Sequence, residues 1–225
     1  VPDKPSRFLI MEGRSWIDIP DNFRTHTGQL KMDAPYSHRD FKAPEWQDDL
    51  VADHPFEVIV KRDDHLSKQT YTHHPFDIMG WDGQLWPYTF PIRAYQARTG
   101  LVHLPPTIHT TFAGGGFVIC SFVPRLYDYH PEAIPAPYNH SNIDSDEVLY
   151  YVDGDFMSRN DIAAGHISLH PAGIPHGPHP GATERSIGQT KTEELAVMVD
   201  TFKPLQVTEE AMKIADEKYH KSWLE

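Results

Sequence analysis

Two short stretches of the chain carry the residues that could bind a metal ion. His140, Asn142 and Glu147 follow the spacing H-x-N-x4-E, and Gly154 comes seven residues after the glutamate. Downstream, "GHISLHPAGIPH" follows the spacing G-x5-P-x-G-x2-H and ends at His176. If a strand begins at Glu147, its carboxylate lies at the start of that strand, and a Pro/Gly turn can return His176 to the same point. The sequence therefore predicts one metal site, with His140, Glu147 and His176 as ligands.

The donor set of this site indicates which metal it would hold. Two neutral imidazoles and one carboxylate leave coordination positions open for a substrate and for O2, which is typical of Fe(II) in non-haem oxygenases. A zinc site more often has three protein ligands and one open position, so zinc is the weaker assignment. Taken alone, a histidine at a Pro/Gly turn or a glutamate at a strand end is more often a surface residue. The two paired spacings, in order along the chain, favour the metal site.

The other histidines cluster in the same part of the chain. Of fifteen histidines, eight lie between His103 and His179. His103, in "GLVHLPPTIH", is expected on a strand and could act as a general base, because an imidazole titrates near neutral pH; a solvent-facing histidine is the alternative. His170 could orient substrate or O2, or could be a packed turn residue. The remaining four are expected at the surface or lining the cavity: His109, His130, His166 and His179.

Composition and charge exclude several classes of protein. The chain of 225 residues is 39% apolar and 23% charged, as in globular proteins. Its net charge of −12 includes no basic block, so neither a nucleic-acid nor a membrane partner is expected. A single cysteine, Cys120, cannot form an internal disulfide, which favours a cytoplasmic location. The first residues, "VPDKPSRFLIMEG", lack an initiator methionine, so the chain is expected to be the carboxyl-terminal part of a longer one.

The pattern of apolar runs and turn residues predicts an all-β fold. Regularly spaced runs bounded by Gly, Pro, Asp or Asn favour an antiparallel sandwich or barrel. One helix is expected at the end of the chain, with Thr208 as its N-cap and "AMKIADEKYHKSW" as its body. "KRDDHLSK" is expected to be a charged link or a hairpin tip, and it lies near a predicted domain boundary. Residues 1–70 are expected to be a remnant of an N-terminal β domain plus a linker, and residues 71–225 are expected to form the iron-binding domain. The expected strands are "RFLIMEG", "RSWIDIP", "FEVIVKR", "GLVHLPP", "FVICSFVPR", "VLYYVDGDFMS", "HISLHP" and "LAVMVDTF".

Longer stretches carry a resemblance to a known family. "HPFDIMGWDGQLWPY", "FVICSFVPRLYDYHPEAIPAPYNHSNIDSDEVLYYVDG" and "SLHPAGIPHGPHPG" resemble homogentisate 1,2-dioxygenases, especially the short bacterial form, within the cupin superfamily. The resemblance implies a cupin-type antiparallel β-barrel (jelly roll) with a C-terminal helix, and Fe(II) bound by His140, Glu147 and His176. It also implies that His103 and His170 are catalytic. The family opens the ring of homogentisate with O2 to give maleylacetoacetate, in tyrosine and phenylalanine catabolism, and forms trimers or hexamers.

Departures from the family pattern leave the substrate open. Some members have a tyrosine where this chain has Phe156, and their spacing to the glutamate is one residue shorter. Tyr138, Tyr150 or Tyr151 could supply a hydroxyl instead. The residues expected to contact substrate are therefore Tyr138, Asn142 and Phe156, and the candidates to hold a substrate carboxylate are Arg93, Arg125 and Arg159. The alternatives are a hydroquinone- or gentisate-cleaving dioxygenase and a non-catalytic cupin that binds or stores a ligand.

Overall fold

The computed structural model describes residues 5–45, 54–75 and 87–224. The chain divides into two compact units, one formed by Val1–Asp40 with Pro91–Glu225 and the other by Phe41–Phe90. The domain boundary expected near residue 70 stays a prediction. None of the helices in the described part of the chain has the length and apolarity that a membrane span requires.

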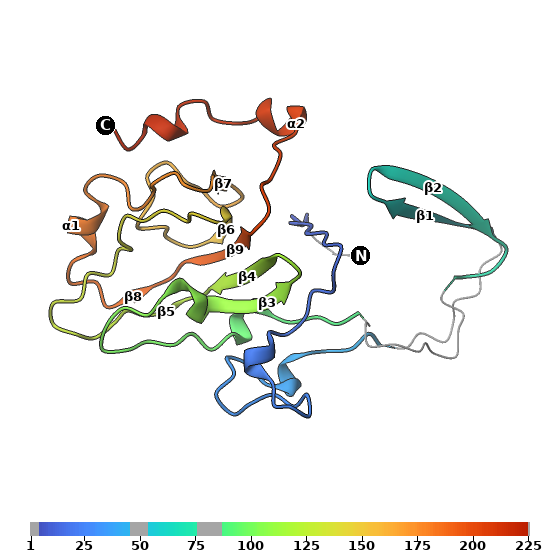
Figure 1. Ribbon diagram of the computed structural model, residues 1–225, viewed down its shortest axis with the longest axis horizontal. Helices are drawn as coiled ribbons and strands as arrows, with labels where there is room; N and C mark the ends of the chain where they lie inside the picture. Colours follow the sequence, from blue (N-terminus) through green and yellow to red (C-terminus); the bar gives the residue numbers. More distant parts are fainter. Residues whose placement is uncertain (1–4, 46–53, 76–86, 225) are drawn as a thin grey trace. The chain divides into compact units, whose positions relative to one another are not determined.

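A five-stranded antiparallel sheet forms the centre of the larger unit (Figure 1). Its strand order is β3-β4-β9-β6-β7, so β9 lies between β4 and β6 although it comes last in the chain. A second sheet pairs only β5 with β8. The expectation of an all-β fold is confirmed. The strands of this unit are β3 (Thr110–Gly114), β4 (Phe117–Phe122), β5 (Arg125–Leu126), β6 (Asp146–Asp153), β7 (Ile167–His170), β8 (Lys191–Thr192) and β9 (Leu195–Thr201).

The core of this unit lies against β6 and β9. Tyr151 on β6 and Ala196 on β9 are paired in register and buried, and Phe156 packs on them from the loop after β6. Phe122 of β4, together with Leu149 and Ile162, surrounds this cluster. Burying β-branched and aromatic side chains on a pleated surface stabilises such strands, so β6 is held in place by the core along its length.

Residues 5–20 are mostly exposed on the larger unit and form no strand. The expected strands "RFLIMEG" and "RSWIDIP" are therefore wrong. Asp18 makes an isolated bridge to Ala113, with both backbone hydrogen bonds at 2.9 Å, while Phe8 and Ile10 are exposed. The segment is extended, as its sequence indicates, but a strand also needs a partner along its length. Further along, the Tyr36 hydroxyl donates to the carbonyl of Thr111 at 2.6 Å.

The expected strand "GLVHLPP" is also wrong, because these residues form a bend and an extended loop. Pro105 and Pro106 have no backbone N–H to donate to a ladder. Pro106 instead begins a short 3-10 helix, Pro106–His109, that leads into β3. His103 consequently lies on a loop. Other 3-10 helices are Asp21–Phe23, His38–Asp40, Ile92–Ala94 and Tyr219–Lys221, and one short α-helix, α1, covers Ala182–Ser186.

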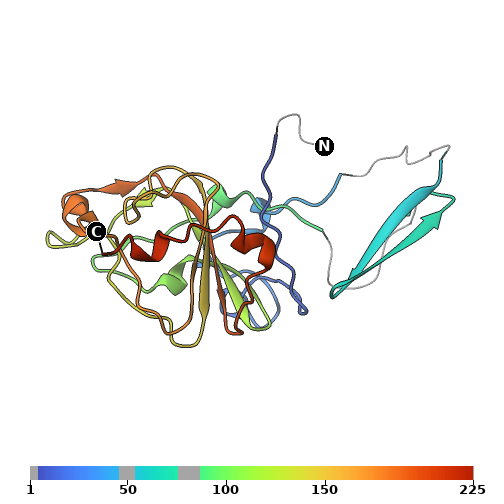
Figure 2. The same ribbon diagram turned by 90° about the horizontal axis from the view of Figure 1, so that it is seen from above.

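The C-terminal helix is much shorter than expected. Thr208 is the N-cap as predicted, since its hydroxyl accepts from the backbone N–H of Ala211 at 3.2 Å. However, α2 covers only Glu209–Met212, and the chain turns again at Asp216, whose side chain accepts from the N–H of Lys218. In Figure 2 this last segment, drawn in red, crosses over the strands of the sheet. The rings of Tyr219 and Trp223 in this segment pack on His179. Tertiary contacts of this kind can override a local helical pattern.

The described part of the smaller unit contains one β-hairpin. Strand β1 (Phe56–Arg62) pairs in antiparallel register with β2 (His65–Tyr71), and Asp63 adopts a left-handed conformation at the turn. "KRDDHLSK" is thus a hairpin tip, one of the two alternatives predicted. Phe41 stacks on Phe90 within this unit. Most of "HPFDIMGWDGQLWPY" lies outside the described residues.

Candidate metal centre

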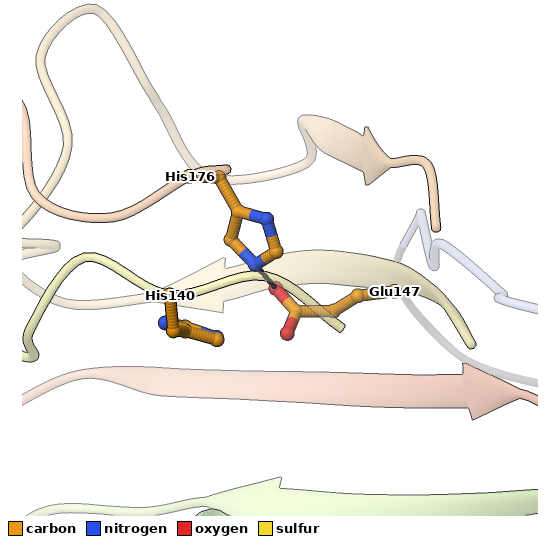
Figure 3. Close-up of side chains that lie close together, drawn as sticks. All are labelled: His140, Glu147 and His176. Carbon is orange, nitrogen blue, oxygen red and sulfur yellow. Dashed lines mark ion pairs between the residues drawn. The ribbon is translucent and has the colours of Figure 1, made fainter. Parts of the chain in front are cut away.

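Three side chains that could hold one metal ion converge at the start of β6. His140, Glu147 and His176 each offer one ligand atom, and these atoms lie within 4.8 Å of one another. Figure 3 shows them coming from separate segments, with Glu147 on the strand and the two histidines on loops. In the part of the chain that the structure describes, this is the only such group of histidine, cysteine and carboxylate side chains.

The two histidine loops are joined directly through their backbones. The N–H of His140 donates to the carbonyl of His176, and the N–H of His176 donates to the carbonyl of His140, both at 2.8 Å. This is an isolated antiparallel bridge between the segment before β6 and the segment after β7. The turn before His176 requires a left-handed residue, which Gly173 supplies with φ +80. The bridge therefore sets the two imidazoles side by side, with ring centroids 4.4 Å apart.

Both imidazoles are held in the form that a metal ligand needs. Nδ1 of His140 lies 3.1 Å from the carbonyl oxygen of Tyr138, and Nδ1 of His176 lies 3.0 Å from that of Ile174. A carbonyl oxygen can only accept, so Nδ1 donates its proton in each case. The lone pair of each neutral ring is then on Nε2, the usual arrangement for a metal-binding histidine whose other nitrogen is hydrogen-bonded.

Glu147 is a buried carboxylate held by two side chains. Nδ1 of His170 lies 2.8 Å from its Oε1, and Nδ2 of Asn142 donates to its Oε2 at 3.2 Å. Burial opposes ionisation of Glu147, but the hydrogen bond from His170, together with the positive charge that His170 and His176 carry when protonated, outweighs it and holds the pKa of this carboxyl well below its usual range. The group at this point therefore carries a negative charge for a cation to neutralise.

The unsatisfied atoms around Glu147 fit a bound divalent cation. Nε2 of His176 is buried without a hydrogen-bond partner among the described residues, and it lies 3.6 Å from Oε1 of Glu147, beyond hydrogen-bond range. A cation bound by both atoms would satisfy each of them. Imidazole and carboxylate donors together suit Fe(II) and metals of similar character rather than Ca²⁺ or Mg²⁺.

A cavity of about 150 Å³ lies beside this group and is lined by His140 and Glu147, whereas His176 is not among its lining residues. His103 lines it from the loop before β3, exposed to solvent, with Nδ1 at 3.8 Å from a carboxylate oxygen of Asp128. The rings of His103 and Tyr138 pack edge to face with their centroids 5.4 Å apart, and the ring of Tyr138 packs in the same way on that of His140. Of the residues expected to bind the metal, to act in catalysis or to contact substrate, those that line this cavity are His103, Tyr138, His140, Glu147 and Phe156.

Asn142 and His170 contact Glu147 instead. Neither is among the residues that line the cavity, and both hold the carboxylate. The ring of His170, on β7, stacks on that of His176 with centroids 4.3 Å apart and an interplanar angle of 16°. The catalytic role expected for His170 and the substrate contact expected for Asn142 stay predictions.

The wall of the cavity is mainly apolar and includes the buried His109. Phe156 is buried and packs edge-on against Tyr151, whose hydroxyl is paired with that of Ser168 at 3.0 Å. Tyr138 and Tyr151 line the cavity, whereas Tyr150 does not. The ring of His109 lies against that of Phe122, and burial together with Arg125 and His103 lowers the pKa of His109 to about 3. His109 is therefore uncharged at neutral pH.

The three candidate arginines differ in their partners. Arg125 lines the cavity, but Nη1 forms an ion pair with Glu194 at 2.8 Å. Arg93 faces Asp153 at 3.8 Å and does not line the cavity. Arg159 lines the cavity and forms no ion pair with any described acidic residue, and its Nε is buried without a hydrogen-bond partner there.

The sequence did not point to the C-terminal residues that pack on this site. Trp223 stacks on His179 with ring centroids 3.9 Å apart, and Ser222 is paired with Nε2 of His179 at 2.7 Å. His179 is 1% exposed, the most completely buried of the four histidines left without a role. The aromatic residues of "YHKSWLE" could have indicated that this segment packs on the rest of the unit. Because the segment was expected to be part of a helix, that packing was not predicted.

Comparison with known proteins identifies the family. A family profile described as "Homogentisate 1,2-dioxygenase C-terminal" matches residues 101–225, and one described as "Homogentisate 1,2-dioxygenase N-terminal" matches residues 24–92. A protein of Saccharolobus solfataricus, provisionally named a dioxygenase, is 40% identical over 98% of this chain and 57% of its own length. Homogentisate 1,2-dioxygenases of Bradyrhizobium diazoefficiens and Homo sapiens are 28% and 26% identical, over 94% and 92% of this chain and 49% of each relative. The chain thus spans about half the length of the curated relatives it matches. It belongs to the homogentisate 1,2-dioxygenase family and has the cupin-type, antiparallel β fold of that family.

Proposed function

We propose that the protein is an Fe(II)-dependent ring-cleaving dioxygenase that converts homogentisate and O2 to maleylacetoacetate, in tyrosine and phenylalanine catabolism. The observation that carries the proposal is the convergence of His140, Glu147 and His176, with both imidazoles oriented for metal binding, beside a cavity. Membership of the family supports the choice of iron and of a dihydroxy aromatic ring as substrate. We expect the protein to act in the cytoplasm as a homo-oligomer, a trimer or hexamer.

Fe(II) held by these three side chains would supply a Lewis acid with open positions for the substrate oxygens and O2. The chain supplies the proton chemistry. The carboxylate of Asp128 near Nδ1 of His103 favours a proton on that nitrogen, which leaves Nε2 to accept the proton of a phenolic hydroxyl. Because His103 lies on the same cavity as His140, the acceptor is close to the proposed metal.

The cavity wall supports a substrate with an aromatic ring and one anionic group. Leu149, Phe156 and Met198 offer apolar surface for the ring and exclude water from it. Of the three arginines considered, Arg159 is best placed to receive a substrate carboxylate, because Arg125 is occupied by Glu194 and Arg93 lies elsewhere. This arrangement favours homogentisate over hydroquinone, which has no carboxylate.

One observation favours a different ring. Phe156 presents no hydroxyl at a position where some family members have a tyrosine. The cavity wall therefore offers one polar contact fewer to a polar substituent on the aromatic ring of the substrate. A hydroquinone- or gentisate-type substrate is therefore the second candidate.

The test is anaerobic reconstitution with Fe(II), followed by an oxygen-electrode assay with homogentisate, hydroquinone and gentisate in parallel. We expect oxygen uptake with homogentisate. The His176→Ala variant should bind no iron, whereas His103→Ala should keep its iron and turn over about 100-fold more slowly or worse. Consumption of hydroquinone but not of homogentisate would overturn the homogentisate assignment. A protein that binds no iron and consumes none of the three rings would instead be a non-catalytic binding module.

A further inference from the structure

The carbonyl of Gly177, the residue after the proposed ligand His176, receives two hydrogen bonds from distant parts of the chain. Nε1 of Trp223 donates to it at 3.1 Å, and Nη1 of Arg159 also donates to it. Trp223 comes from the C-terminal segment, and Arg159 from the loop after β6. A single carbonyl oxygen with two lone pairs is fully occupied by these donors.

The same glycine contacts the other histidine loop. A Cβ at Gly177 would lie 2.1 Å from Oδ1 and 2.8 Å from Cα of Asn139, the residue before His140. Only glycine allows this approach. Together with the paired backbone bonds between His140 and His176, it makes the two loops one packed element. Fixing the Gly177 carbonyl therefore fixes the backbone that carries both imidazoles.

Trp223 is itself held firmly enough to act as an anchor. Its ring stacks on His179 at 3.9 Å, lies beneath the guanidinium of Arg159 at 5.9 Å, and contacts the edge of His170 at 6.5 Å. Stacking and cation–π contacts of this kind fix the plane of an indole, and with it the direction of its N–H.

We infer that Trp223 is a positioning residue for the metal centre: through its N–H to the Gly177 carbonyl, the C-terminal segment holds the His140 and His176 loops in the geometry that binds the metal. The inference rests on the proposed metal site and does not depend on which ring is the substrate. Without this bond the joined loops can shift relative to Glu147 in the metal-free protein, and metal binding must then restore their arrangement. The hydrogen bond from Trp223 to the Gly177 carbonyl therefore raises metal affinity by organising the site in advance.

The decisive variant is Trp223→Phe, which keeps a six-membered aromatic ring for stacking on His179 but loses the N–H donor together with the second ring of the indole. We expect its Fe(II) dissociation constant, measured anaerobically by competition with a chelator, to rise about 10-fold, within the usual range for groups that support metal ligands. Trp223→Ala, which also loses the stacking, should show a rise of about 100-fold. Leu224→Ala is the matched control, because Leu224 is next in the chain and is 85% exposed. Its affinity should equal that of the unaltered protein.

A spectroscopic measurement separates positioning from general weakening of the fold. The visible absorption bands of the Co(II)-loaded protein report the arrangement of the ligands, and Trp223→Phe should change them while Leu224→Ala does not. Equal metal affinity and an unchanged Co(II) spectrum in Trp223→Phe would overturn the inference, whatever the activity. If the unaltered protein binds metal but consumes none of the aromatic rings, the proposed reaction is wrong. The metal affinity and the Co(II) spectrum of Trp223→Phe still decide whether Trp223 positions the metal centre.

Discussion

The hydrogen bond between His170 and Glu147 offers a direct test of how the metal ligands are supported. His170 is 4% exposed, its Nδ1 lies 2.8 Å from Oε1 of Glu147, and its ring stacks on His176. The variant His170→Ala removes both the donor and the stacking partner. Glu147 then keeps Asn142 as a hydrogen-bond donor on its other oxygen.

The expected loss follows from the chemistry of such partners. Groups that orient a metal ligand usually account for about 10- to 100-fold of metal affinity. That corresponds to about 1.4 to 2.8 kcal/mol of binding free energy. Loss of a ligand itself should be far larger, about 1,000-fold or more, as expected for His176→Ala. The free energy of unfolding of the metal-free His170→Ala variant should fall by about 1.5 to 3 kcal/mol, the usual range for a hydrogen bond to a charged group.

Anaerobic Fe(II) titration against a chelator measures the first effect, and urea unfolding followed by circular dichroism measures the second. The matched control is His166→Ala, an exposed histidine just before β7. It should change neither quantity appreciably. Unaltered iron affinity in His170→Ala would show that Glu147 needs no support from this side. A loss as large as that of His176→Ala would show that His170 is itself a ligand, and the assigned set would be wrong.

Three further predictions concern the fold. Because the pKa of buried His109 is lowered to about 3, the unfolded chain binds a proton that the folded one does not between pH 6.5 and 3. Stability should therefore fall by up to about 1.4 kcal/mol per pH unit as the pH drops through this window, and urea unfolding of His109→Phe should show a flatter dependence. Gly154→Ala should lower the free energy of unfolding by about 3 kcal/mol, because at φ +95 the added Cβ would lie 2.1 Å from a backbone oxygen. Gly173→Ala should lower it by only about 1 kcal/mol, because a Cβ there would lie in open space. Tyr36→Phe should cost about 1 kcal/mol through its buried hydrogen bond, and exposed Tyr129→Phe less than about 0.5 kcal/mol; equal effects would refute the role given to the Tyr36 hydroxyl.

Four of the five strands of the central sheet, all except β3, could be predicted because local signals and tertiary packing agree there. The runs that form β4, β6, β7 and β9 are short, apolar and bounded by turn residues, and their side chains are largely buried. The convergence of the three proposed ligands could be predicted for a related reason. Their spacing requires only a strand that begins at Glu147 and a Pro/Gly turn that returns His176, and both are decided within a few residues of sequence.

The elements that could not be predicted depend on partners elsewhere in the chain. Residues 7–20 have the composition of strands, but the part of the larger unit that the structure describes offers them only the bridge at Asp18. "GLVHLPP" has apolar residues in a strand-like order, but two prolines deprive it of ladder donors. At Thr208 the local capping signal was right about where the helix begins. The helix ends after one turn, and beyond the turn at Asp216 the rings of Tyr219 and Trp223 pack on His179, a contact between distant residues that a local pattern does not reveal.

The metal centre combines these two kinds of information. His140, Glu147 and His176 are recognisable because ligand chemistry restricts the residue types at each position. The groups that hold them in place are not restricted in this way, since any donor of suitable length could occupy the Gly177 carbonyl. The donors actually used come from 18 and 46 residues away, from Arg159 and Trp223. A sequence therefore shows which atoms can bind a metal more readily than how firmly they are held, and we expect the metal affinity of this site to depend on how firmly they are held.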